Sequence, residues 1–347
     1  MRLEAIENPS LLRLAGFPIA ALLAAVVVAS GLAGLAGANP LDVLGLIATG
    51  AVGSKFALLE TLNRATPLIF CGLSVAVAFR ARLWNIGAEA QFYAGAVVAV
   101  LLGTGAVGAP FVLPISAAMA MLAGAILLLG PVLLKTKLGV DEVVTTLLFN
   151  FIMLLIVSYL LEGPMKDPAG MGWPKSAALI SEARLPRLVT GLRLHWGFAL
   201  ALIAAVVVWV IQTRTTLGFE MRAVGQNPNA ARFAGMPVTA VLIKTALISG
   251  GLAALGGWSE VAGLKGHLSL DLSPGFGYTG IIVAMLALLR PLAVVLSAIF
   301  VAGVFVGSDS MSRAAGVPTY IADMLLAVAL LFIVLGVALS KLRMVRG

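Results

Sequence analysis

Long apolar runs separated by short polar stretches make up most of the chain. Runs of about 18 or more apolar residues can cross about 30 Å of hydrocarbon as helices, and the strict alternation that a membrane β-barrel requires is absent. We therefore predict an all-α polytopic membrane protein with a single transmembrane domain over residues 1–347. About ten transmembrane helices are expected, near residues 15–37, 57–79, 85–103, 110–134, 141–161, 196–213, 240–258, 279–289, 291–307 and 319–340.

Broken or re-entrant segments are expected between some of these crossings. Residues 40–53 are too short and too rich in glycine to cross, and the short eighth run follows a polar loop, GLKGHLSLDLSPGFGYTG, which is typical of a broken helix near the outer surface. Many of the 38 glycines lie inside the apolar runs, where small residues let helix backbones approach closely. Dense packing of this kind suits a transporter and also a static membrane anchor.

A short polar helix is predicted in the loop at about residues 214–238, within RAVGQNPNAARFAGMP. Asn227 is a good N-cap, Pro228 fits the first helical position, Gly235 can adopt the left-handed conformation after the helix, and Pro237 prevents continuation. A helix of about two turns is marginal in water, so it must dock against another surface. That surface is either the protein's own bundle or a cytoplasmic partner.

Composition and charge agree with a membrane protein. Hydrophobic residues make up 61% of the chain and charged residues 11%, and the mean hydropathy is +1.08, which leaves too little polar surface for a water-soluble globule. The net charge of +8 arises mostly from Lys and Arg at one set of helix ends, and no basic stripe is interleaved with aromatics. By the positive-inside rule we predict that both termini are cytoplasmic and that the loop at about 162–195 lies outside. The absence of a basic stripe excludes nucleic-acid binding as the reason for the positive charge.

Catalytic chemistry is not expected in this chain. No Walker A sequence occurs, and the glycines of GTGAVG at 103–108 and GFGYTG at 275–280 lie outside the strand–turn–helix unit that binds phosphate. His195 and His267 lack metal-ligand spacing and are expected at solvated or interfacial positions, whereas Cys71 is expected to be buried in its apolar run. We therefore predict no ATP hydrolysis by the chain itself, no catalytic residue, no metal and no cofactor.

Several polar residues fall within the predicted crossings, where lipid cannot satisfy them. Asn85 and Glu89 are four residues apart and would share one helix face, with Gln91 close by; they either form an interhelical hydrogen-bond network or contact a substrate. Glu60 and Arg64 are also four apart, and an ion pair is favoured over a role in the substrate path. The substrate-path candidates are Asn85, Glu89, Gln91, Phe92, Glu60 and Arg64, with Tyr93 and Trp84 as further aromatics for stacking.

Three stretches carry a resemblance to a known family. They are LNRATPLIFCGLSVAVAFRARLWNIGAEAQF, TTLGFEMRAVGQNPNAARFAGMPV and PGFGYTGIIVAMLALLRPLAVVLSAIFVAGVF. In these stretches and in its pattern of spans, over about residues 55–340, the chain resembles permease subunits of ABC importers in the branch for nucleosides and simple sugars, which is related more distantly to branched-chain amino-acid permeases. Two departures, Ala90 in place of a usual glycine and ALLRP before Pro291, leave the substrate unassigned.

The resemblance implies the membrane subunit of an ATP-driven importer that moves a nucleoside or simple sugar across the bacterial inner membrane by alternating access. The short helix would be the coupling helix, seated in a groove of a cytoplasmic ABC ATPase, and the residues that match the family pattern there are Gly225, Asn227, Ala230, Ala231 and Gly235. The further implied partners are a second permease subunit that is a different chain, an extracytoplasmic substrate-binding protein and membrane lipids.

Two other functions fit the residues themselves. An ion-coupled secondary transporter of a small polar solute also uses broken helices and needs intramembrane acids, for which Glu60, Glu89 and Asp323 are available. A non-catalytic membrane scaffold would account for the packing glycines alone. The polar helix between two spans favours the ATP-driven importer over both.

Overall fold

A computed structural model describes residues 39–105, 108–189 and 191–315, residues 2–5 and 342–345, and single residues within 24–31 and 324–339. Its helices are α2 (Pro40–Val52), α3 (Lys55–Arg80), α4 (Ala88–Gly103), α5 (Val112–Leu138), α6 (Glu142–Glu162), α7 (Trp196–Arg214), α8 (Thr216–Gln226), α9 (Pro228–Phe233), α10 (Val238–Glu260), α11 (Phe276–Leu286) and α12 (Pro291–Ala315). The shorter elements are the 3-10 turns η1 (Ala109–Phe111) and η2 (Ser181–Ala183), the π-helical turn η3 (Val261–Lys265), and the strands β1 (Arg2–Ala5) and β2 (Leu342–Val345).

The predicted helical fold class is confirmed. Among the residues that the structure describes, the only strands are β1 and β2, which pair antiparallel. The chain forms two compact units, of which the first combines Met1–Thr61 with Phe300–Gly347 and the second is Leu62–Ile299. Since α3 and α12 cross the boundaries between them, each of these helices contributes to both units.

Close contacts at glycine hold α2 against the C-terminal part of α12 in the first unit. The side chain of Asn39 caps the start of α2. Gly50 lies against Ser310, and Gly307 lies against the carbonyl of Ile47, at positions where a Cβ atom would overlap the neighbour. Small residues therefore allow these two helices to meet backbone to backbone.

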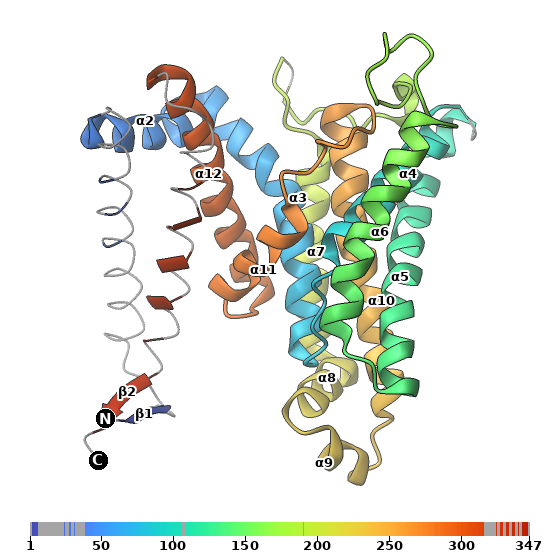
Figure 1. The fold of residues 1–347 in the computed structure, drawn as a ribbon, viewed down its shortest axis with the longest axis vertical. Coiled ribbons are helices and arrows are strands. Elements are labelled where there is room, and N and C mark those ends of the chain that lie inside the picture. The colour runs from blue at the N-terminus through green and yellow to red at the C-terminus, as the bar shows by residue number, and fades with distance from the viewer. Residues whose placement is uncertain are drawn as a thin grey trace. The chain divides into compact units, whose positions relative to one another are not determined.

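Helix α4 lies at the centre of the second unit, packed against α5, α6, α10 and α11 (Figure 1). Most of its 16 residues are buried, and the exposed side chain of Leu101 lies in its last turn. Helix α10 crosses both α4 and α5 at glycines. Gly257 lies against the carbonyl of Phe92, and Gly250 lies against the carbonyl of Gly124.

Alanine at Gly257 is expected to destabilise the protein strongly. A Cβ atom there would lie 1.8 Å from the carbonyl oxygen of Phe92, and backbone cannot move aside as a flexible side chain can. We expect a loss of at least about 3 kcal/mol, the upper range for overpacking, measured as a lower melting temperature in detergent. Gly130→Ala is the control, because its Cβ would meet only Phe149 at an ordinary 3.5 Å; equal melting temperatures of the two variants would contradict the prediction.

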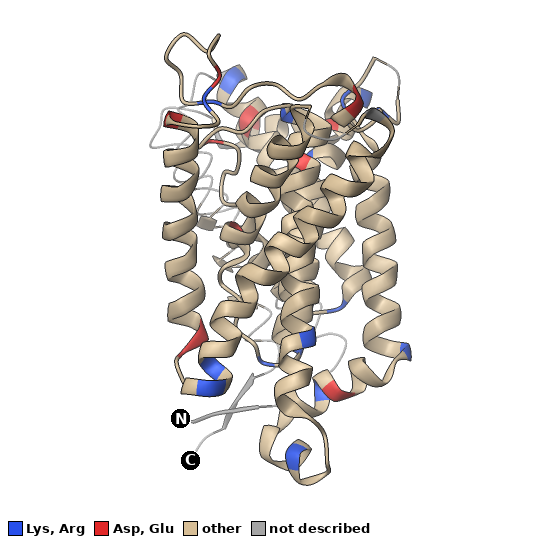
Figure 2. Cartoon of the chain, turned by 90° about the vertical axis from the view of Figure 1, so that its right-hand side faces the viewer, with Lys and Arg blue, Asp and Glu red and all other residues tan. Residues whose placement is uncertain are grey.

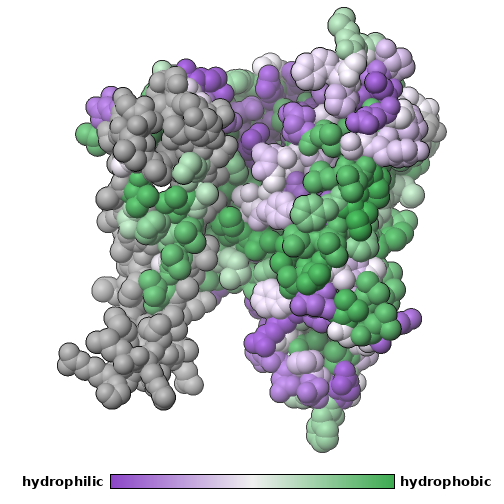
Figure 3. Space-filling view, viewed as in Figure 1, coloured by the Kyte–Doolittle hydropathy of each residue, from purple (hydrophilic) through white to green (hydrophobic). Residues whose placement is uncertain are grey.

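The chain is a multi-pass membrane protein. Charged residues gather at the two ends of the helices (Figure 2), and an apolar surface lies between the more polar ends of the second unit (Figure 3). Six helices of the described part are long and apolar enough to cross a membrane, namely Lys55–Arg80, Val112–Leu138, Glu142–Glu162, Trp196–Arg214, Val238–Lys265 and Pro291–Ala314.

The predicted count of ten crossings is not confirmed. The crossings expected at 85–103 and 279–289 correspond to α4 and α11, whose 16 and 11 residues make helices about 24 Å and 17 Å long at 1.5 Å per residue. Both are shorter than the hydrocarbon layer because a non-helical segment precedes each of them. The stretch at 40–53, which was expected to be too short to cross, forms the 13-residue helix α2. The crossings predicted at 15–37 and 319–340 fall largely outside the described residues.

Candidate functional site

A non-helical segment, Ala81–Gly87, separates α3 from α4 inside the second unit. Arg82 has a left-handed φ of 50° where the chain leaves α3, and Leu83 and Asn85 are buried. Asn85 was expected to share a helix face with Glu89, but α4 begins only at Ala88, so the two do not form one stripe. Because packed apolar side chains and lipid cannot satisfy peptide groups, this segment needs polar partners from the protein.

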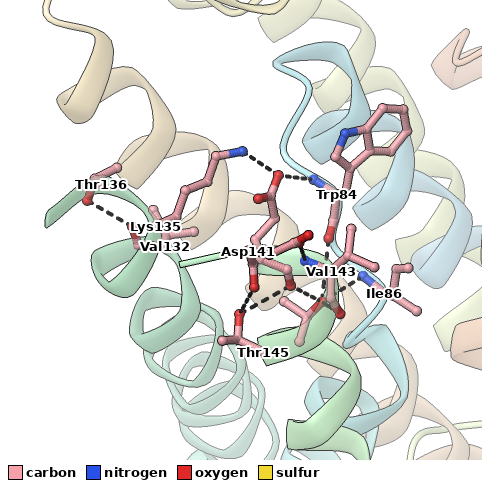
Figure 4. Close-up of polar contacts among 10 residues, drawn as sticks. Trp84, Ile86, Val132, Lys135, Thr136, Asp141, Val143 and Thr145 are labelled. Atoms are coloured by element: carbon pink, nitrogen blue, oxygen red, sulfur yellow. Dashed lines mark hydrogen bonds and ion pairs between the residues drawn. The ribbon is translucent and has the colours of Figure 1, made fainter. Parts of the chain in front are cut away.

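Three buried polar residues of α6 supply these partners. Glu142, Thr146 and Asn150 recur at every fourth position, so they lie along one face of the helix, and we call them the α6 ladder. Glu142 Oε1 accepts a hydrogen bond from the Trp84 N–H at 3.4 Å, and Thr146 Oγ1 accepts one from the Ile86 N–H at 3.3 Å. Figure 4 draws the contacts at this end of the ladder.

Asn150 completes the ladder where α4 begins. Its Oδ1 accepts a hydrogen bond from the Ala90 N–H at 2.9 Å, and its Nδ2 donates to the carbonyl of Ile86 at 3.0 Å. The same Nδ2 donates to the hydroxyl of Tyr278 in α11 at 3.0 Å. One fully buried amide thus joins the segment, α4 and α11. Sequence reasoning missed the ladder, although three polar residues at four-residue spacing in the run DEVVTTLLFN were a visible signal.

An ion pair closes the other end of the ladder. Glu142 pairs with Lys135, which lies in the last turn of α5. Asp141 caps α6, its Oδ1 accepting a hydrogen bond from the Val143 N–H at 2.7 Å. Glu142 lies in the first helical turn, where the helix dipole favours negative charge. A buried carboxylate needs a charged or hydrogen-bonding partner, and Glu142 has both, in Lys135 and in the Trp84 N–H. Its carboxylate therefore links the α5–α6 turn to Trp84 (Figure 4).

A second polar cluster lies at the centre of the unit. The amides of Asn85 and Gln91 exchange two hydrogen bonds of 2.9 Å. Asn85 Nδ2 also donates to Ser249 Oγ of α10 at 3.1 Å, and the Ser249 hydroxyl donates to the carbonyl of Ser74 in α3 at 2.9 Å. All four side chains are buried. These bonds form an interhelical network in this conformation, and contact with a substrate stays a prediction for Asn85 and Gln91.

Glu89 caps the start of α11. Its Oε2 accepts a hydrogen bond from the Gly277 N–H at 2.6 Å, so the first turns of α4 and α11 meet at this carboxylate. A Cβ atom at Gly277 would overlap the backbone of Glu89, one at Gly280 would overlap Cys71, and Gly275 has a left-handed φ of 89°. The glycines of GFGYTG therefore allow a turn and close helix packing. Cys71 is buried, as predicted.

An aromatic cluster lies beside this carboxylate. The ring centroid of Phe92 is 5.7 Å from that of Phe276 and 5.8 Å from that of Tyr93. The guanidinium carbon of Arg64 lies 5.4 Å from the centroid of Phe276, which is a cation–π contact. The pairing of Glu60 with Arg64 stays a prediction, because the two residues, one turn apart on α3, belong to different units.

The predicted short helix is α9, and its start and end are confirmed. Asn227 Oδ1 accepts hydrogen bonds from the N–H groups of Asn229 and Ala230 at 3.0 and 3.1 Å, and Pro228 is the first helical residue. Gly235 follows the helix with a left-handed φ of 81°. The capping residues read from the sequence therefore set the helix boundaries locally.

Helices α8 and α9 together connect α7 to α10, and we call this connection the α8–α9 loop. One of its faces packs on the rest of the second unit and the other is exposed. Ala231 is only 4% exposed, whereas Phe233 at the end of α9 is 96% exposed. In α8, Gly225 lies against Arg80, and a Cβ atom there would come within 2.3 Å of the Arg80 carbonyl oxygen. Helix α8 thus packs on the end of α3, directly before Ala81–Gly87. Sequence reasoning missed Phe233, for which an aromatic residue within the polar stretch RAVGQNPNAARFAGMP was the only signal.

His195 is buried, so the expectation of a solvated position is wrong. It is the N-cap of α7, its Nδ1 accepting a hydrogen bond from the Gly197 N–H at 3.1 Å. The ring packs against Gly263 in the π-helical turn, where a Cβ atom would overlap it. Burial lowers the pKa of His195 to about 4, because the imidazolium cannot be solvated there. The residue lies just before the spanning helix Trp196–Arg214.

Acidification is expected to destabilise the protein through His195. The folded pKa is about 4, below the value of about 6.5 for an unfolded histidine, so the unfolded state takes up the proton first as the pH falls. The neutral imidazole of His195 makes its full contribution to the free energy of unfolding above about pH 6.5. This contribution falls towards pH 4, by on the order of 3 kcal/mol. Thermal melting in detergent across this window measures it. His195→Asn keeps a capping acceptor and should flatten the dependence, so an unchanged profile would argue against this cause.

Comparisons with known proteins show which transport proteins the chain resembles in sequence. A family model described as the permease component of the branched-chain amino acid transport system matches residues 57–335, which include both the α6 ladder and the α8–α9 loop. The chain is 37% identical over 334 residues to a glucose ABC transporter permease protein of Haloferax volcanii, covering 92% of this chain and 87% of the relative. It is 35% identical over 287 residues to a guanosine ABC transporter permease protein of Bacillus subtilis, covering 82% of each. A nucleoside ABC transporter permease protein of Lactococcus lactis is 30% identical over 293 residues, covering 82% of this chain and 80% of the relative.

Proposed function

The chain belongs to the family of branched-chain amino acid transport system permease components, in its nucleoside and sugar branch, and on that premise we propose that it forms half of an ATP-driven import path for a nucleoside or a simple sugar. It is the non-catalytic permease subunit of an ABC importer, and ATP is hydrolysed by a partner chain. The proposal includes ten crossings, both termini in the cytoplasm, and a place in the bacterial inner membrane.

The α8–α9 loop carries the proposal. It extends from the ends of α7 and α10, its inner face is fixed by Ala231 and Gly225, and Phe233 is left almost fully exposed. A loop packed on one face, with Phe233 almost fully exposed on the other, is a suitable contact for a groove in a cytoplasmic ABC ATPase, since buried aromatic residues supply much of the binding energy of interfaces. The other proposed partners are a second permease chain and an extracytoplasmic substrate-binding protein.

Alternating access is the proposed mechanism, and the broken helices support it. The segment Ala81–Gly87 and the start of α11 both interrupt helices inside the second unit, and Glu89 joins them. Such breaks let short helical pieces move without unfolding the long spans around them. In the proposed cycle, ATP draws the two ATPase subunits together, and the bundle passes between outward-open and inward-open states.

The proposed substrate class rests on the relatives and on the groups near the breaks. The relatives are named for glucose, guanosine and nucleosides. The amides of Asn85 and Gln91 can exchange their mutual hydrogen bonds for bonds to hydroxyl or base groups, and Phe92 belongs to an aromatic cluster that suits a ring. These side chains are the proposed substrate contacts in another state of the cycle.

Purification with native partners, followed by uptake, tests the proposal. The tagged chain should bring down a protein with Walker motifs, and proteoliposomes of the complex with its binding protein should take up radiolabelled guanosine or glucose only when ATP is present. Uptake that survives ATP depletion but collapses with an ionophore would instead establish ion-coupled transport. A chain that purifies alone and supports no uptake of either solute would contradict both.

A further inference from the structure

The α6 ladder has no role in the transport scheme described so far, although its hydrogen bonds reach Ala81–Gly87, α4 and α11. We propose that Glu142, Thr146 and Asn150 are positioning residues that carry movement of the α8–α9 loop to the central polar network and to α11. The inference rests on the proposed function, because the movement it transmits is the one that the ATPase would drive.

The first step in this transmission is the contact between the α8–α9 loop and the end of α3. Gly225 of α8 has no room for a side chain against the Arg80 carbonyl, so α8 cannot shift towards α3 without displacing it. The side chain of Gln212 donates to the carbonyl of Ala76, and Arg222 of α8 donates to the carbonyl of Gln212 at 2.6 Å. The loop therefore contacts α3 directly at Arg80 and is linked to Ala76 of α3 through Gln212 of α7, and both positions lie in the last turns before Ala81–Gly87.

The second step in the transmission is the set of hydrogen bonds between the α6 ladder and the non-helical segment Ala81–Gly87. The ladder receives or donates hydrogen bonds at Trp84, Ile86 and Ala90, so it takes the place of the helical bonds that this backbone lacks. A continuous helix through these positions would need no partner from α6. Three buried polar side chains in a helix long and apolar enough to cross a membrane are costly, and their alignment along the break gives each of them hydrogen-bond partners.

The third step leads from the ladder to α11. Asn150 donates to Tyr278, while Glu89 of α4 accepts from Gly277 one helical position earlier in α11. The segment also carries Asn85, whose amide bonds to Gln91 and Ser249 form the central network. A shift of Ala81–Gly87 along the ladder would therefore change the central network and tilt α11 together.

Threonine at two adjacent positions offers a matched test. The hydroxyl of Thr146 accepts from the Ile86 N–H of the segment and is within 3.4 Å of the Trp84 carbonyl, to which it can donate. The hydroxyl of Thr145 donates only to the carbonyls of Asp141 and Glu142, close to it in the chain. Thr146→Val and Thr145→Val make the same chemical change, and only the first removes a contact with the segment. Thr146→Ser keeps the hydroxyl and should rescue.

A fluorescent reporter on the segment makes the readout independent of the solute. Trp84 is 42% exposed, so Trp84→Cys, in a Cys71→Ala background, can carry a bimane group in the complex with its ATPase. Trapping with ATP and vanadate should shift the bimane emission in the unsubstituted ladder and in Thr145→Val. Thr146→Val should reduce the shift about fivefold while ATP hydrolysis continues, the factor expected for the loss of one typical hydrogen bond.

The outcomes separate the inference from the function on which it rests. A full emission shift in Thr146→Val, or an equal loss in Thr145→Val, overturns the inference while ATP hydrolysis by the complex upholds the proposed function. A purified complex with no ATP hydrolysis overturns both. If Thr146→Val does not assemble, Tyr278→Phe takes its place, because it removes only the hydroxyl that Asn150 contacts. This variant should abolish the emission shift of a bimane at Met285→Cys in α11 and preserve the emission shift of the bimane at residue 84. Any other result overturns the link to α11.

Discussion

Replacing Phe233 by Asp is expected to abolish ATP-driven uptake and to release the ATPase from the permease. Phe233 is 96% exposed at the end of α9, on the side of the loop that is not packed against the protein. If it is the anchor of the ATPase contact, its loss should cost about 2 kcal/mol or more, which lowers the affinity by about 30-fold. Co-purification of the ATPase and uptake into proteoliposomes are the two measurements.

Met171→Asp provides the control for Phe233→Asp. Met171 is equally exposed, at 96%, but it lies in the loop at about 162–195 that is predicted to face outside. The control should keep both the ATPase and the uptake, so a loss in both variants would point to general destabilisation. If Phe233→Asp retains the ATPase at full stoichiometry, the proposed contact is wrong.

Replacing Glu89 by Leu is expected to lower uptake by about 5- to 150-fold. The Gly277 N–H would be buried without its acceptor, and an unsatisfied buried donor costs about 1 to 3 kcal/mol, enough to depopulate the arrangement in which α4 and α11 meet. Initial uptake rates in proteoliposomes with matched amounts of assembled complex measure the effect.

Glu89→Gln separates the structural role of Glu89 from a proton- or ion-coupling role. The amide oxygen of Gln can still accept from Gly277, so an ATP-driven importer should keep most of its uptake. A transporter that couples solute to ion movement through this carboxylate would lose uptake with Gln as fully as with Leu. Equal losses in the two variants would therefore favour the ion-coupled alternative over the capping role.

Local signals in the sequence predicted the features that depend on neighbouring residues. The caps of α9 at Asn227 and Gly235 formed as expected, because a cap is made by a side chain and the backbone within a few residues. The buried position of Cys71 followed from its apolar run. His195 was misplaced, because its burial depends on Gly263, which is distant in the sequence and lies in a π-helical turn.

The candidate site was predicted only in part for a similar reason. Asn85, Glu89 and Gln91 stood out as polar residues in an apolar run, but the sequence did not show that the helix breaks before Ala88. The break is stable because α6, more than 50 residues later, presents partners for the unpaired peptide groups. Periodicity within one segment cannot reveal hydrogen bonds that another segment supplies.

The sequence by itself determined that the chain is a helical membrane protein, where most long spans lie, and where a short capped helix interrupts them, because hydropathy and capping act locally. Only the tertiary structure decided which apolar runs are interrupted by non-helical segments, which glycines are contact points, and which polar groups are paired. Those outcomes depend on backbone groups that must find partners away from water, and the partners come from distant parts of the chain.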